Sequence, residues 1–166
     1  MKDLPSRKQN RLKDYDYSQE GAYFITICVK DRHEMLGTIN VGANCVRPVL
    51  LSEYGETVER EIAILSETYA AVDVVCHVVM PNHIHMIIVI NNAEPTSGRT
   101  QFAPTISRVV KQFKGSVTKK MGFSIWQKSF HNHIIRYEDD YLCIYTTLNT
   151  TLDFARLIME CYTDFY

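Results

Sequence analysis

The sequence has no apolar run of the roughly 18–20 residues that a membrane-spanning helix requires, and its first residues lack the apolar segment of a secretory signal. Its five cysteines are odd in number and scattered, without a CxxC pair. This pattern argues against a disulfide framework or a cysteine zinc site, and favours reduced thiols in a cytoplasm. With only 7 Gly and 5 Pro in 166 residues, the chain is expected to form one globular domain over 1–166.

Net charge is also low, at −1, but the charges are unevenly distributed. Residues 1–13 carry five basic side chains against one acid, and residues 99–120 carry six basic side chains and no acid. Two such segments can form a phosphate-contacting surface, although the lysines can equally be a solvated helix face. The candidates for DNA binding are Arg108, Lys111, Lys114, Lys119, Arg7, Lys8 and Arg11.

The order of hydrophobic patterns predicts strands mixed with helices. Strands are expected over 21–31 and after the turn-like segment near residue 42, and a helix over 52–69 with Ser52 as its N-cap. Residues 70–80 and 83–90 are two apolar runs, which form either two paired strands or one bent strand. An amphipathic helix over 103–121, a short strand before residue 136 and a helix over 138–148 follow. This order favours an α+β sandwich with helices packed on an antiparallel sheet.

Two histidines interrupt the second apolar run, in "MPNHIHMIIVI". Residues i and i+2 of a strand face the same side, so His83 and His85 are expected to project together. Two imidazoles on one face can converge on a divalent metal ion, although a lone histidine there would more often be a satisfied core residue. The pair lacks the three ligands of a catalytic zinc site, so a further ligand is expected from elsewhere.

"VVMPNHIHMIIVI" resembles the His-hydrophobic-His signature of HUH single-strand endonucleases, and in particular the REP-associated tyrosine transposases within the IS200-like single-tyrosine family. "VVKQFKGSVTKK" looks like the basic helix of that family, and "IWQKSFHNHIIRYEDDY" like its WQ…HIIR…DY segment. The resemblance implies a ferredoxin-like fold and a homodimer in the bacterial cytoplasm or nucleoid, encoded by a mobile element. It also implies DNA transposition, in which hairpin DNA is nicked and rejoined through a phosphotyrosine. His83 and His85 would hold Mg²⁺ or Mn²⁺ at the scissile phosphate.

The last part of the chain departs from the family pattern D-Y-x-x-I-x-x-Y-[IA]-x-x-N-P. The nucleophilic tyrosine falls on Thr147, and the asparagine that serves as a further metal ligand falls on Thr151. Tyr145 and Tyr141 are weak substitutes, since Tyr145 lies two residues before the expected position and Tyr141 matches a different one. We therefore interpret 146–166 as an anomalous tail, for which a frameshift near Thr146 is one hypothesis. The alternative function is an inactive or repurposed relative that binds hairpin DNA and metal without cutting.

In "FHNHIIR", two further histidines are also spaced i and i+2. His131 and His133 are either a second metal- or phosphate-contacting pair, or a structural strand residue beside an exposed one. Trp126 could stack on a base, but it is more typical of a core anchor.

Overall fold

The computed structural model describes residues 17, 19–39, 49–91 and 104–149, in which four strands form one antiparallel sheet. The strands are β1 (Gly21–Cys28), β4 (Val72–Met80), β5 (His83–Ile90) and β6 (His131–Ile135), in the spatial order β4-β5-β1-β6. Helix α1 (Glu53–Thr68) connects β1 to β4 and helix α2 (Ile106–Met121) connects β5 to β6. This βαββαβ order and strand arrangement is ferredoxin-like, so the predicted α+β class is confirmed.

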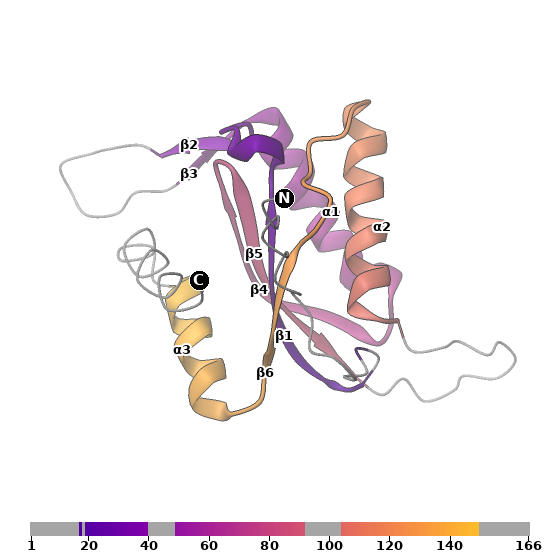
Figure 1. The fold of residues 1–166 in the computed structure, drawn as a ribbon, viewed down its shortest axis with the longest axis vertical. Helices are drawn as coiled ribbons and strands as arrows, with labels where there is room; N and C mark the ends of the chain where they lie inside the picture. Colours follow the sequence, from indigo (N-terminus) through magenta and orange to yellow (C-terminus); the bar gives the residue numbers. More distant parts are fainter. Residues whose placement is uncertain (1–16, 18, 40–48, 92–103, 150–166) are drawn as a thin grey trace, which may run out of the picture.

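The helices cover the two faces of the sheet unequally. Figure 1 shows α1 and α2 together on one face, while α3 (Glu138–Asn149) lies alone on the other. The 3-10 turn η1 (Lys30–Arg32) follows β1, and a small second sheet pairs β2 (Gly37–Ile39) with β3 (Val49–Leu51). The two apolar runs are therefore two paired strands, joined at Pro81 and Asn82.

Helix α2 forms as its amphipathic sequence pattern predicts. Every apolar residue that the sequence assigned to the inner face of α2 is buried: Ile106, Val109, Val110, Phe113 and Val117. The helix begins after the Thr105 cap and ends at Gly122, whose φ of 79° is left-handed and therefore favours glycine. Trp126 is 6% exposed and packs 5.8 Å from the Phe113 ring, so it is a core anchor.

The contact between α1 and α2 contains one buried acid. The predicted Ser52 cap is confirmed, because its hydroxyl accepts a hydrogen bond from the Gly55 amide at 3.2 Å. Further along α1, Glu61 is 4% exposed and bonds to both Ser116 and Lys120 of α2. Burial disfavours the charged form of Glu61, but the hydrogen bonds from Lys120 and Ser116 outweigh it, so its pKa is lowered.

No helix within the described ranges is long and apolar enough to cross a membrane. Among the cysteines of those ranges, Cys28, Cys76 and Cys143 are free thiols. Burial raises the pKa of Cys28 and of Cys76.

Candidate metal centre and nucleic-acid interface

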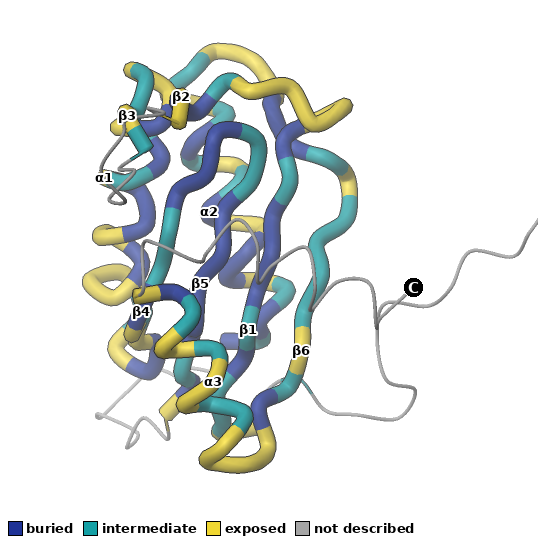
Figure 2. Tube along the Cα trace, turned by 90° about the vertical axis from the view of Figure 1, so that its left-hand side faces the viewer, coloured by how far each residue is buried: buried dark blue, intermediate teal, exposed yellow. Residues whose placement is uncertain are grey.

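His83 and His85 lie together at the start of β5, as the strand spacing predicts. Their ring centroids are 4.6 Å apart, with the planes inclined at 79°. Alternation along β5 sends Ile84, Met86 and Ile88 into the core under α1 and α2. The histidines therefore project from the opposite face, on which Ile87 packs with residues of α3. Figure 2 shows α3 over this face of the sheet.

Each histidine is oriented by a neighbouring oxygen atom. Thr26 is the cross-strand partner of His85, and its hydroxyl lies 2.8 Å from Nδ1 of that ring. His83 directs its own Nδ1 to the side-chain oxygen of Asn82, at 2.6 Å. In both rings Nε2 is then the nitrogen that a metal ion would use, because an oxygen partner on Nδ1 fixes ring orientation and raises ligand basicity.

The surroundings keep both rings neutral, which metal ligation requires. Burial, with a smaller contribution from the charge of Arg32, lowers the pKa of His83 to about 4. His85 is 1% exposed and stacks on Phe24 at 5.2 Å between centroids. Its burial, and then its proximity to His83, hold its pKa well below the ordinary value.

The pair would supply two nitrogen ligands to a metal ion. Within residues 17–39, 49–91 and 104–149, apart from Ser18, no cluster of three or more His, Cys, Asp or Glu side chains could hold a metal. Two imidazoles leave the remaining positions of an ion such as Mn²⁺ or Mg²⁺ to waters and substrate phosphate oxygens, and oxygen is the ligand atom that such hard cations prefer. They do not make a closed structural zinc site, which has four protein ligands.

Helix α3 approaches this pair with its carboxyl end. Asn149 accepts a hydrogen bond from the Cys76 thiol at 3.6 Å. Cys76 pairs with Ile87, and two residues along β4, Val78 pairs with His85. The end of α3 is therefore two cross-strand rows, or roughly 7 Å, from the row of His85.

Thr147, at the nucleophile position, lies on this last part of α3. Its hydroxyl donates to the Cys143 carbonyl at 2.7 Å, one helical turn earlier. Tyr141 and Tyr145 stack on each other with centroids 5.9 Å apart. Tyr141 packs against the small core between α3 and the sheet, whereas Tyr145 is 38% exposed. Thr151 lies outside the described residues, as does the 146–166 tail from residue 150 onward.

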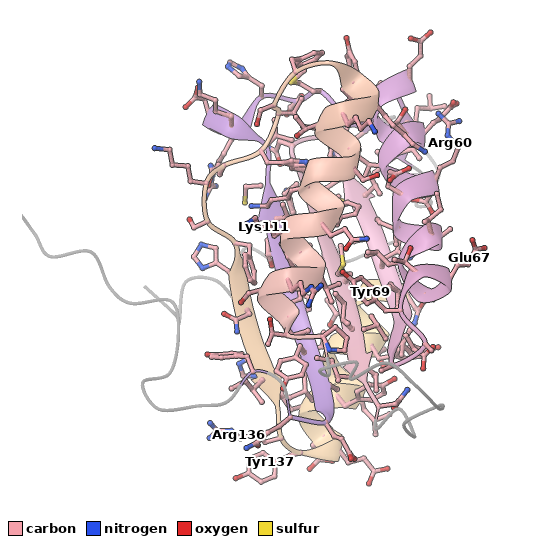
Figure 3. All side chains as sticks on the ribbon, turned by 90° about the vertical axis from the view of Figure 1, so that its right-hand side faces the viewer. Arg60, Glu67, Tyr69, Lys111, Arg136 and Tyr137 are labelled. Carbon is pink, nitrogen blue, oxygen red and sulfur yellow. The ribbon has the colours of Figure 1, made fainter. Side chains whose placement is uncertain are left out.

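The basic side chains of α2 lie on the other face of the sheet. Arg108, Lys111 and Lys119 are exposed, and Figure 3 shows Lys111 on the outer side of α2. Lys114 is half-buried instead, donating to the carbonyls of Gln127 and Ser129, both at 2.9 Å. Burial lowers the pKa of Lys114 to about 8. The fold thus separates the α2 basic residues from the histidine pair, and Arg7, Lys8 and Arg11 lie outside the described residues.

The second histidine pair lies on β6, at the edge of the sheet. His133 bonds to Asp140 at 2.8 Å and so ties β6 to the first turn of α3. His131 is the β6 partner of Thr26, which places it in the same cross-strand row as His85 with β1 between them.

Sequence reasoning missed three residues around the candidate metal centre: Thr26, Asn82 and Arg32. Asn82 adjoins His83 in the chain, a signal that was present in "MPNHIH". Thr26 lies 59 positions away from His85, and only the register of β1 against β5 brings the two together. Arg32 follows β1, and its backbone, like that of Asp31, has a φ of 55°. Non-glycine residues in this left-handed region cost about 1–3 kcal/mol each, and such strain concentrates at functional sites.

Comparisons with known proteins agree with the motifs and the fold. No protein-family model matches the chain. An uncharacterized protein of Haemophilus influenzae is 33% identical over 159 residues, which cover 84% of this chain and 84% of that protein. A second protein of the same bacterium, assigned to the REP-associated tyrosine transposases, is 24% identical over 75% of this chain and 66% of its own length.

The fold is similar to that of a solved structure of a REP-associated tyrosine transposase bound to a REP hairpin, with a TM-score of 0.59 and 18% sequence identity. The match covers 83% of this chain and 70% of that one.

Proposed function

This chain belongs to the REP-associated tyrosine transposase family, and on that premise we propose that it binds hairpin DNA with a single-stranded flank together with a divalent metal ion. The observation that carries the proposal is the pair of neutral, oriented imidazoles of His83 and His85 on one sheet face. The related transposase structure contains a REP hairpin, which supports this class of DNA for the present chain.

The residues of the site have separate tasks in this proposal. His83 and His85 hold Mg²⁺ or Mn²⁺ through Nε2, while Asn82 and Thr26 fix the two rings. When bound, the ion supplies Lewis-acid polarisation of a phosphate and neutralises its charge. The low pKa of His83 keeps its ligating nitrogen unprotonated down to about pH 4. Exposed Arg108, Lys111 and Lys119 contact phosphates further along the DNA.

The test is a binding titration with a fluorescent hairpin that carries a single-stranded flank. We expect the affinity to be higher in Mn²⁺ than in EDTA, and the Mn²⁺ effect to disappear in His83→Ala. We also expect binding to weaken steeply with salt, because phosphate contacts release counterions. Equal affinity in Mn²⁺ and EDTA would refute the metal-dependent part, and absence of binding would refute the proposal as a whole.

A second candidate function is nicking and rejoining of the same DNA, as in transposition. The family pattern favours it, but Thr147 occupies the nucleophile position and its hydroxyl is bonded to the Cys143 carbonyl. Tyr145 is the exposed tyrosine of the same helix and is the substitute to test. End-labelled DNA incubated with the protein and Mn²⁺ would give a covalent adduct on a denaturing gel. Shifted but uncut DNA would identify a binding protein without nuclease activity.

A homodimer acting on mobile-element DNA in the bacterial cytoplasm or nucleoid belongs to the same proposal. The family resemblance supports this part of the proposal. Sedimentation of the purified chain would measure its oligomeric state. A monomer at all accessible concentrations would contradict this part and leave the metal site unaffected.

A further inference from the structure

The turn after β1 is fixed beside the histidine pair by backbone hydrogen bonds. Cys28, the last residue of β1, is the cross-strand partner of His83. The next amide, that of Val29, donates to the Asn82 carbonyl at 2.9 Å, and the Arg32 amide donates back to the Val29 carbonyl at 3.1 Å. On its other side, the Lys30 amide donates to a carbonyl of the segment before β6, at 2.7 Å.

This turn presents Arg32 with its backbone in a conformation that side chains rarely adopt. Asp31 and Arg32 both have a φ of 55°, and both are exposed. Two successive left-handed residues other than glycine are unusual, and glycine would occupy either position without strain. The sequence nevertheless has an arginine here, which indicates that its side chain contributes something a glycine could not.

Arg32 follows the end of the strand that pairs with His83, and its backbone is tied through Val29 to Asn82, the residue before His83. Among the described residues, no ion pair or hydrogen bond holds the Arg32 side chain. Its guanidinium is therefore a cation without an ion-pair partner among the described residues, at the end of the strand next to the histidine pair.

We propose that Arg32 binds a phosphate of the DNA strand at the His83–His85 site, and so aligns that strand against the pair. This inference rests on the proposed function. A guanidinium offers two parallel N–H donors to two phosphate oxygens, which fixes orientation as well as supplying charge. Arg32 is a positioning residue for the phosphodiester, distinct from the phosphate contacts of α2 on the other face of the sheet.

Three variants and a control test this assignment with the full chain and the flanked hairpin in Mn²⁺. Arg32→Gln removes the charge, Arg32→Lys keeps the charge without the paired donors, and Arg32→Gly removes the charge while relieving the left-handed strain. Arg60→Gln is the matched control, since Arg60 is exposed on α1, on the far face of the sheet (Figure 3), and its side chain contacts Glu56 at 3.9 Å and Thr57 at 3.1 Å within the same helix. The melting temperature of each protein is also measured.

We expect Arg32→Gln and Arg32→Gly to bind about tenfold more weakly, with Arg32→Lys between them and the wild type. The slope of log affinity against log salt should fall by about 0.7, the value for one lost contact to a single strand. Arg32→Gly should melt at a higher temperature than the wild type while binding more weakly, which a purely structural role would not produce. Arg60→Gln should match the wild type throughout.

Two outcomes would overturn the assignment. The first is wild-type affinity and salt slope in Arg32→Gln. The second is weaker binding with an unchanged slope and a lower melting temperature, which would mean that Arg32 only supports the turn. A wild-type chain that binds no DNA would instead refute the proposed function itself, whatever the variants do.

Discussion

Replacement of His85 should separate its structural role from its proposed role as a metal ligand. The side chain is 1% exposed, bonds to Thr26 at 2.8 Å and stacks on Phe24. His85→Ala removes the ring from a close-packed site and leaves the Thr26 hydroxyl buried without that partner. Loss of the hydrogen bond and of packing together should lower the free energy of unfolding by about 2–4 kcal/mol.

His85→Asn is the more informative variant. The asparagine amide can occupy the position of Nδ1 and keep a bond to Thr26, but it has no atom at the position of Nε2. We therefore expect a smaller loss of stability than in His85→Ala, about 1–2 kcal/mol. Both variants should lose the metal-binding nitrogen completely.

The assay is urea unfolding with and without Mn²⁺ at a fixed protein concentration. A ligand that binds only the folded state at one hundred times its dissociation constant stabilises by about 2.7 kcal/mol. We expect such a gain in the wild type and almost none in His85→Asn, even though that variant is folded in the absence of metal. An equal Mn²⁺ gain in His85→Asn and the wild type would show that Nε2 of His85 is not a ligand.

Three further predictions concern the scaffold and the basic helix. Glu61 has a lowered pKa in the folded chain, so its stabilising contribution is present above the ordinary value of 4.5 and is lost as the pH falls below it. Glu61→Gln should therefore reduce the loss of unfolding free energy at acid pH, and an unchanged acid limb of the stability–pH curve would contradict this. Gly55→Ala would place Cβ 2.0 Å from a backbone oxygen and should cost several kcal/mol, whereas Gly115→Ala meets nothing within 4 Å and should stabilise by about 0.5–1 kcal/mol in urea unfolding. Arg108→Gln with Lys111→Gln should reduce the salt slope of hairpin binding by about 1–2, and an unchanged slope would remove α2 from the interface.

Local patterns in the sequence predict most of the secondary structure, because they report which face of an element is apolar. The buried face of α2, the Ser52 cap and the alternation that projects His83 and His85 to one side are of this kind. Because Pro81 interrupts the apolar pattern, the sequence was consistent with either two paired strands or one bent strand. Only the register of β4 against β5 decides between them.

The surroundings of the site depend on contacts between distant segments, which no local pattern encodes. Thr26 reaches His85 through strand pairing, and Arg32 follows β1 in a left-handed turn whose backbone is tied to Asn82. The relative position of α2 is also non-local. Its amphipathic pattern identifies a basic outer face, but only the sheet topology shows that this face is directed away from the histidine pair.

Direct detection of the metal ligands tests the central claim most closely. Electron spin-echo spectroscopy of Mn²⁺ bound to the protein–hairpin complex detects nitrogen atoms coordinated to the ion. We predict imidazole nitrogen coupling in the wild type and weaker coupling in His83→Ala. We predict no such coupling in the double variant that combines His83→Ala with His85→Asn. A Mn²⁺ signal with no nitrogen coupling in the wild-type complex would contradict the assignment of this pair as the metal site.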